Sequence, residues 1–237
     1  AIGGTGTGIV WPMDQDLFSF DLAYNYMHKI VSTGAAGLEV KKVTADESAL
    51  QDLTVVSSTA GIEELKTITV YVNPYNQTPK ITEDIKGYIV AKGATSVTDP
   101  AQLNAAYQIS VERGENPIFT GAVDPSAQSV AIGGCLEGSL WPAENNVVKF
   151  TATKAWQWYK LTLTGADTLA AYVDANDDGL LSDPAEKLTL IAGAAGRSYL
   201  QLATVATGGS DVYLVISNTT GEAEYEICVA EDDHRNN

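Results

Sequence analysis

Short stretches in which apolar and polar residues alternate run through the whole chain of 237 residues. In the clearest stretch, Tyr159, Leu161 and Leu163 fall on one side of an extended backbone. Trp158 and Lys160 fall on the other side, which is the pattern of a β-strand with one face in a core. Glycine, proline and asparagine separate one such stretch from the next. The alternation therefore predicts a protein built from short strands.

The same pattern predicts strands in both halves of the chain. They are expected at residues 18–20, 27–31, 38–43, 67–72, 87–91, 106–112, 147–151, 169–173, 187–191, 199–202, 211–217 and 225–230. Helix is expected only at residues 45–52, 100–106 and 184–187. Short strands at regular spacing with turn residues between them indicate antiparallel sandwiches. The predicted fold class is all-β, with two tandem antiparallel β-sandwich domains of the jelly-roll kind.

The second half of the chain repeats the first. Ala-Ile-Gly-Gly opens both residues 1–12 and residues 131–142, and a glycine and a Trp-Pro pair follow at the same spacing in each. Further matches keep the same order, namely Phe20 with Phe150, Gly34 with Gly165, Tyr88 with Tyr213 and Tyr107 with Tyr225. Such a long ordered match indicates a duplicated domain.

The domain boundaries follow from this repeat. The first β-sandwich is expected over residues 1–115, a linker over residues 116–130 and the second β-sandwich over residues 131–237. The linker carries an apolar run at residues 118–123, whereas a flexible linker is poor in apolar residues. This run is expected to dock as a strand on one of the domains.

The charge balance argues against several classes of partner. The 30 acidic residues outnumber 14 basic ones and give a formal net charge of −16. The chain has no basic stripe that would neutralise phosphates, which argues against nucleic acid. No apolar run approaches the roughly 20 residues of a transmembrane helix, so no membrane span is expected. The sequence starts at Ala1 rather than Met, as secreted proteins do after removal of a signal peptide, and an extracellular location is expected.

Two cysteines, Cys135 and Cys228, lie in the second copy of the repeat. The first copy has Thr5 and Ser110 at the matching places. If the copies share a fold, the cysteines join the first segment of the second domain to its last strand. This pattern predicts a disulfide formed in an oxidising compartment. The alternative is a pair of separate buried thiols.

The sharpest chemical signal is a loop rich in Asp and Asn at residues 174–183. Oxygen ligands at alternate positions, followed by glycine for a tight turn, allow one loop to surround a hard cation such as Ca²⁺. The expected ligands are the side chains of Asp174, Asn176, Asp178 and Asp183 and the carbonyl group of Leu180. The loop departs from an EF-hand, because Ala185 occupies the place of the bidentate Glu and Glu186 comes one place later. A bound ion would be structural; the alternative is a turn without metal, since Asp and Asn favour turns.

Trp156 and Trp158 permit two interpretations. If exposed, they would stack on sugar rings and bind a polysaccharide. If buried, they are core residues, as aromatic residues on one face of a sheet usually are. The core interpretation is favoured. Trp11 and Trp141, each followed by proline, are likewise expected to anchor the start of each sandwich.

Residues that would form a catalytic site are scarce. The only histidines are His28 and His234, and no histidine pair has metal-ligand spacing. No serine lies in a nucleophile elbow. A hydrolase with two catalytic carboxylates has no positive feature beyond the abundance of acidic residues. We therefore expect a protein that is not an enzyme.

The second copy carries a sequence of strands that is found in one known family. An aromatic strand at 158–161 is followed by an apolar strand at 169–173 that runs into the loop rich in Asp and Asn, and strands at 213–215 and 225–229 close the copy. In these features it resembles the bacterial pre-peptidase C-terminal (PPC) domain, a small β-sandwich appended to secreted enzymes. The first copy keeps the outer strands and lacks the loop. The resemblance implies a non-catalytic accessory role outside the cell.

These features predict a secreted structural protein. Its two sandwiches are expected to assemble head to tail with other copies of the chain into a surface filament or layer. The first copy has no segment ahead of it that corresponds to residues 118–123, and uncovered strand edges invite pairing. A neighbouring copy would supply the missing partner. The alternative is an extracellular carbohydrate-binding module that uses Trp156 and Trp158.

Overall fold

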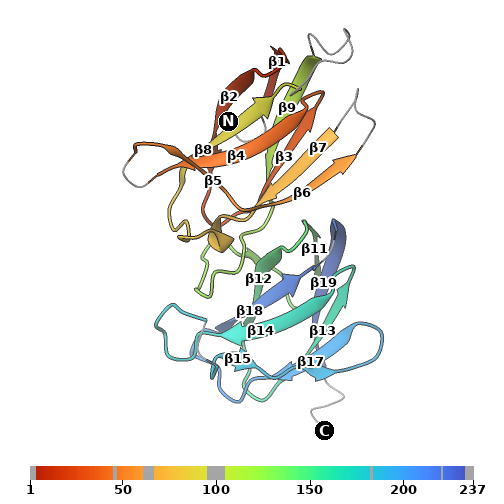
Figure 1. Cartoon of the computed structure of the whole chain (residues 1–237). Helices are drawn as coiled ribbons and strands as arrows, with labels where there is room; N and C mark the ends of the chain where they lie inside the picture. Colours follow the sequence, from red (N-terminus) through yellow and green to blue (C-terminus); the bar gives the residue numbers. More distant parts are fainter. Residues whose placement is uncertain are drawn as a thin grey trace. The chain divides into compact units, whose positions relative to one another are not determined.

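Strands make up both halves of the chain in the computed structural model (Figure 1). The structure describes residues 4–44, 47–60, 67–94, 105–181, 184–219 and 221–232. Within these residues the only helical element is a single 3₁₀ turn at Pro74–Asn76, so the predicted all-β class is confirmed. No described segment forms a helix long and apolar enough to cross a membrane. The chain divides into two compact units, Ala1–Gly114 and Glu115–Asn237.

The first unit is an antiparallel sandwich of two sheets. Its strands are β1 (Thr5–Val10), β2 (Gln15–Leu22), β3 (His28–Thr33), β4 (Gly37–Val43), β5 (Leu50–Asp52), β6 (Val55–Ala60), β7 (Thr67–Val72), β8 (Ile85–Lys92) and β9 (Ala105–Arg113). One sheet has the order β1-β9-β3-β7-β6 and the other the order β2-β8-β4-β5. Because the chain crosses between the sheets at each step from β1 to β4, the sandwich is of the jelly-roll kind.

The second unit has the same arrangement. Its strands are β10 (Gln128–Ser129), β11 (Cys135–Leu140), β12 (Asn145–Ala152), β13 (Trp158–Thr164), β14 (Thr168–Val173), β15 (Lys187–Leu188), β16 (Ile191–Ala192), β17 (Arg197–Gln201), β18 (Ser210–Ser217) and β19 (Ala223–Glu231). The sheet orders are β11-β19-β13-β17-β16 and β10-β12-β18-β14-β15. Apart from the additional β10, each order repeats that of the first unit strand for strand (Figure 1). The predicted duplication is therefore confirmed in the topology.

The register of the strands repeats as well. Gly8 lies opposite Tyr107 in the first unit, and Gly138 lies opposite Tyr225 in the second. A Cβ atom on Gly138 would come within 2.6 Å of the Tyr225 ring, so only glycine leaves room for the tyrosine that covers it. The same steric reason applies at Gly8. Both units thus keep a glycine–tyrosine pair that the repeat predicts.

The core of each unit lies between its two sheets. In the first unit the rings of Phe20 and His28 meet edge to face across the sandwich, with centroids 5.9 Å apart. Phe150 and Tyr159 meet in the same place in the second unit, with centroids 5.2 Å apart. Tyr159 and Leu161 are fully buried, as the alternation along their strand predicts. Each large apolar side chain buried in this way contributes about 1.5–3 kcal/mol.

The predicted helices are not found among the described residues. Leu50–Asp52 form strand β5, and the turn before it is closed by the Thr44 N–H, which donates to the Ala49 carbonyl at 2.9 Å. Residues 184–186 form a turn, and the predicted helix at 100–106 lies largely outside the described residues. The strand predicted at 187–191 is two short strands in different sheets. Where a strand forms in place of a predicted helix, pairing with a neighbouring strand outweighs the local preference of the sequence for helix.

Residues 116–130, called the strap from here on, belong to the second unit and do not form a separate linker. The Val147 N–H on β12 donates to the Pro117 carbonyl at 3.0 Å. Further along, β10 pairs with β12 as a parallel strand. Phe119 stacks on Tyr172 with ring centroids 5.1 Å apart. The strap therefore pairs with the outer edge of β12, and its apolar side chains pack on the outer face of the same sheet.

Candidate functional site

The two units differ most at the strand edge formed by β2 in one and by β12 in the other. In the second unit, β12 has β18 on one side and the strap with β10 on the other. In the first unit, β2 pairs with β8 on one side, and no described strand pairs with it on the other. The backbone N–H and C=O groups of an unpaired edge are a template for further pairing. The first unit therefore has an open edge at β2.

Four large apolar side chains on β2 and on the segment before it are exposed. They are Ile9, Trp11, Met13 and Leu17, with exposed fractions of 56, 55, 83 and 55%. These four residues, called the apolar edge from here on, lie at the end of β1, in the following turn and on β2. Single apolar side chains on a surface are ordinary, whereas a group of them marks an interaction site.

Two of the four matching residues of the second unit are buried, whereas Ala143, which corresponds to Met13, is exposed. Trp141, which corresponds to Trp11, is 9% exposed, and Val147, which corresponds to Leu17, is 1% exposed. Val147 packs in one cluster with Ala127 of the strap. The prediction that Trp11 anchors the first sandwich is wrong, because its side chain is exposed.

Carboxylates flank the apolar edge. The Tyr107 hydroxyl donates to the Asp16 carboxylate at 2.6 Å, and burial together with this bond raises the pKa of Tyr107. Asp14 is exposed in the turn before β2. The second unit has Glu144 and Asn146 at these two places. The open edge of the first unit therefore combines exposed apolar side chains with negative charge.

The loop predicted to bind Ca²⁺ joins β14 to β15. Asp174 accepts hydrogen bonds from the Asp178 N–H at 3.2 Å and the Gly179 N–H at 3.0 Å. Asn176 Oδ1 also accepts from the Asp178 N–H, at 3.1 Å. The Leu180 backbone forms a β-bridge with the strap. These bonds fold the loop back on itself and bring its polar side chains together.

Three carboxylates meet in this loop. One oxygen atom from each of Asp174, Asp178 and Glu186 lies within 4.8 Å of the others. Glu186, which comes one place late for an EF-hand, is 1% exposed, and its carbonyl accepts the Val173 N–H at 2.9 Å. It reaches the cluster because the loop closes as a strand connection instead of entering a helix. The predicted ligand Asp183 lies outside the described residues. Oxygen ligands of this kind suit a hard cation such as Ca²⁺.

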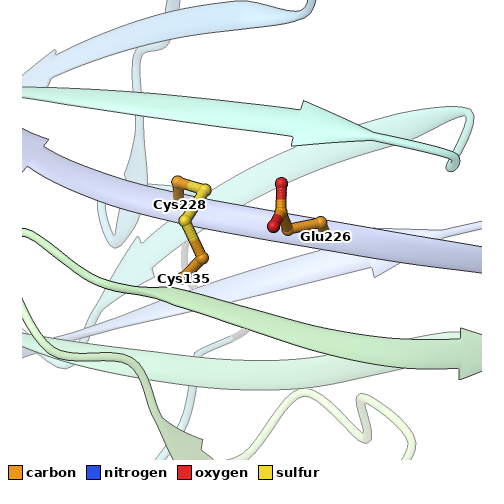
Figure 2. A group of neighbouring side chains, drawn as sticks. All are labelled: Cys135, Glu226 and Cys228. Atoms are coloured by element: carbon orange, nitrogen blue, oxygen red, sulfur yellow. A yellow bond between two sulfur atoms is a disulfide. The ribbon is translucent and has the colours of Figure 1, made fainter.

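The predicted disulfide is present. Cys135 on β11 and Cys228 on β19 lie directly opposite each other and are bonded, with Cα atoms 4.0 Å apart (Figure 2). Bridging residues that are 93 positions apart stabilises the fold by about 4–5 kcal/mol. Glu226 lies beside the bond (Figure 2), but bonded sulfur atoms have no thiolate with which to hold a metal ion. These three residues are therefore not a metal site.

Trp156 is exposed, and the interpretation that it belongs to the core is wrong. It lies in the turn before β13 with a φ of 61° and with 64% of its surface exposed. Its N–H donates to the Leu202 carbonyl at 2.7 Å, so the backbone of the turn is held in place. Trp158, the first residue of β13, is partly buried. Of the two predicted sugar-binding residues, Trp156 is thus the one that a ligand can reach.

His28 is placed as a structural residue. It is fully buried, and burial lowers its pKa to about 4. The Ala23 N–H donates to His28 Nε2 at 3.1 Å. A neutral imidazole inside a sandwich has no access to a substrate, so His28 does not serve as an acid or base. His234 lies outside the described residues.

No family model matches the chain, and no curated protein matches its sequence. Among solved structures, the chain is similar to one from Eubacterium rectale that is described as "a putative secreted protein". The two share 10% sequence identity and a TM-score of 0.27, over 95% of this chain and 72% of the other. At this TM-score the fold assignment rests on the strand order and register given above. The resemblance to the PPC domain stays a prediction.

Proposed function

We propose that this chain is a secreted structural protein without catalytic activity, and that copies of it assemble through the apolar edge of the first unit. One observation carries the proposal. The strand edge that is open at β2 in the first unit is covered by the strap at the matching strand β12 in the second unit. Because both units have the same strand order, the second unit illustrates how such a face is completed. A second copy of the chain would complete the first unit by pairing with β2 and covering Trp11 and Leu17.

The free energy gained by burying apolar side chains favours this pairing over its cost in lost freedom of movement. Full burial of a side chain such as Leu or Met contributes about 1.5–3 kcal/mol, and the apolar edge holds four exposed apolar residues. Association costs at least about 4 kcal/mol in lost freedom of movement. Burial of the apolar edge offsets this cost, and backbone hydrogen bonds along β2 would fix the orientation of the partner. If the contact repeats with a rotation that does not close, the copies form an open filament.

The disulfide supports the extracellular part of the proposal. Disulfides form and persist in oxidising compartments and are rare in the cytosol. The bond between Cys135 and Cys228 joins two neighbouring strands inside one unit, so it serves the stability of the folded chain. A protein that assembles outside the cell benefits from such a bond because chaperones are absent there.

Sedimentation velocity over a range of protein concentrations tests assembly, and electron microscopy distinguishes a filament from a dimer. The wild-type chain is expected to form larger species as its concentration rises. Leu17→Glu places a charge in the apolar edge and is expected to keep the chain monomeric. Ile191→Glu changes a residue of the second unit that is 41% exposed, and this control is expected to assemble as the wild type does. A wild-type chain that stays monomeric at every concentration refutes the proposal.

A second candidate function is favoured by the exposure of Trp156. An exposed indole ring stacks well on a sugar ring, so the second unit would bind a polysaccharide. In affinity electrophoresis, Trp156→Ala is expected to lose retention by the polysaccharide, while Trp11→Ala is expected to keep it. Equal retention of the wild type and Trp156→Ala would exclude this function.

A further inference from the structure

A buried polar cluster lies in the second unit, where the strap meets the start of β12. Its members are Glu144 in the turn before β12, Asn146 on β12 and Asn116 on the strap, with exposed fractions of 2, 0 and 1%. Each has one buried side-chain oxygen that accepts no hydrogen bond from the described residues, namely Oε1 of Glu144 and Oδ1 of each asparagine. Such acceptors are rare in protein interiors, and each one requires an explanation.

The hydroxyl group of Tyr225 lies next to this cluster. The Asn116 amide donates to this hydroxyl at 3.2 Å, and the Asn146 amide donates to the Ser139 carbonyl at 3.0 Å. Burial raises the pKa of Tyr225 to about 12, and the nearby charge of Glu144 adds to the shift. Glu144 lies in the turn that leads into β12, two positions before Asn146, and both side chains are buried. These contacts bring the three residues with unsatisfied oxygens to the same part of the second unit.

The hydrogen bonds to Glu144 do not balance the negative charge of its ionised carboxylate. Its Oε2 accepts the Trp141 N–H at 2.6 Å, and within the described residues no Lys or Arg forms an ion pair with it. Burial, followed by the nearby charge of Glu115, raises the pKa of Glu144 to about 7. A single water molecule has two hydrogens and would satisfy only two of the three acceptors. Buried charges in proteins are paired with an opposite charge or coordinate a metal ion.

We propose that Glu144, Asn146 and Asn116 bind one monovalent metal cation of the sodium class. Oxygen atoms from a carboxylate and two amides are the ligands that hard cations prefer. One positive charge balances the one buried carboxylate, because Glu115 is exposed to water, whereas a divalent ion would leave an unpaired charge in the interior. The other titratable groups that face the site are Tyr225 on β19 and Glu115, which precedes the strap.

The cation would fasten the strap to the sandwich. Asn116 belongs to the strap, while Glu144 and Asn146 belong to the turn and strand beneath it. An ion that contacts all three holds these segments together, in addition to the hydrogen bonds between the strap and β12. This role does not depend on whether copies of the chain assemble.

Thermal unfolding in two salts tests the site. In a Trp11→Phe variant the remaining three tryptophans all lie in the second unit, so their fluorescence reports the unfolding of that unit alone. The buffer is kept at about pH 8, where Glu144 is ionised, and contains a chelator that removes divalent ions. The midpoint is expected to be at least about 3 °C higher in NaCl than in tetramethylammonium chloride of equal concentration.

Two variants separate the site from general salt effects. Glu144→Gln removes the charge with little change of shape and is expected to abolish the difference between the salts. Asp14→Asn changes the matching, exposed position of the first unit and is expected to leave the difference intact. A salt difference that survives Glu144→Gln would overturn the proposal.

Sodium NMR measures binding directly, because a bound ion relaxes faster than a free one. The wild-type protein is expected to broaden the sodium line, and Glu144→Gln is expected to remove most of the broadening even if the variant is less stable. Equal midpoints in the two salts together with no Glu144-dependent broadening would overturn the proposal. The three acceptors would then be satisfied by water or by a proton on Glu144.

Discussion

At the scale of single residues, burial decides the state of the ionisable groups. His28 and Glu144 are both almost inaccessible to water, and burial moves each pKa toward the neutral form. The pKa of His28 falls to about 4, and that of Glu144 rises to about 7. His28 is therefore uncharged at neutral pH, while Glu144 sits at the midpoint of its titration. Titration of Glu144 near neutral pH is therefore expected to change the stability of the second unit.

In buffer without sodium, the free energy of unfolding of the second unit is expected to fall as the pH rises from about 5 to about 8. The pKa of Glu144 is about 7 in the folded chain, against an ordinary value of 4.5. Between these values the folded chain binds more protons than the unfolded chain, so stability is greatest below the lower value and is lost as the pH passes 7. The loss approaches about 3 kcal/mol. Urea unfolding of the wild type and Glu144→Gln at both pH values checks this, and the same pH dependence in both proteins would contradict it.

At the scale of elements, one strand framework carries different additions in the two units. The disulfide ties β11 to β19, and the strap covers β12. The matching strands of the first unit, β1, β9 and β2, have neither addition among the described residues. Because the register is the same in both units, a feature of one unit can be transferred to the other.

Thr5 lies opposite Ser110 in the same register that Cys135 shares with Cys228. The double variant Thr5→Cys and Ser110→Cys is therefore expected to form a second disulfide. It should raise the free energy of unfolding of the first unit by about 3–4 kcal/mol, because the bond constrains the unfolded chain. Urea unfolding with and without reductant measures the gain, with Thr5→Cys alone as the control. Two titratable thiols in the folded double variant would contradict the shared register.

The calcium site in the loop after β14 stays a prediction, with Asp174, Asp178 and Glu186 as the carboxylates that would hold the ion. Adding Ca²⁺ to protein treated with a chelator is expected to raise the unfolding midpoint of the second unit by at least about 3 °C, since the ion binds only the folded loop. Asp178→Asn is expected to remove most of this gain, and Asp14→Asn in the first unit to remove none. Identical melting curves with Ca²⁺ and with chelator would exclude the site.

At the scale of the whole molecule, charge and apolar surface act in opposite directions. A net charge of −16 makes copies of the chain repel one another. The apolar edge of the first unit draws copies together, because contact removes Trp11 and Leu17 from water. The balance between the two effects depends on salt, which screens the repulsion and leaves the apolar contact in place.

Association is therefore expected to become several-fold stronger when the ionic strength rises from about 0.01 M to about 0.1 M, where the screening length falls from about 30 Å to about 10 Å. Light scattering at a fixed protein concentration measures the change. Leu17→Glu is expected to show little association at either salt concentration. Association of the wild type that weakens as salt is added would indicate contacts between opposite charges and would contradict an apolar interface.

Several features could be predicted from the sequence because their signals are local or repeated. A period of two depends only on neighbouring residues, and it placed Tyr159 and Leu161 in the core. The repeat related Cys135 and Cys228 to Thr5 and Ser110, and so to facing strands. Local signals were misleading at Leu50–Asp52, within the predicted helix, where pairing with β4 produces a strand.

Which surfaces are covered was decided by the tertiary structure alone. Trp11 and Trp141 hold the same place in the repeat and are both followed by proline, yet one is exposed and the other buried. In the same way, Glu186 joins Asp174 only because the chain turns back between β14 and β15. Alternation along a strand determines which face a side chain occupies, but burial of that face requires a second segment. The sequence alone thus determined most of the strands, the duplication and the disulfide, while contacts between segments determined the open edge and the candidate sites.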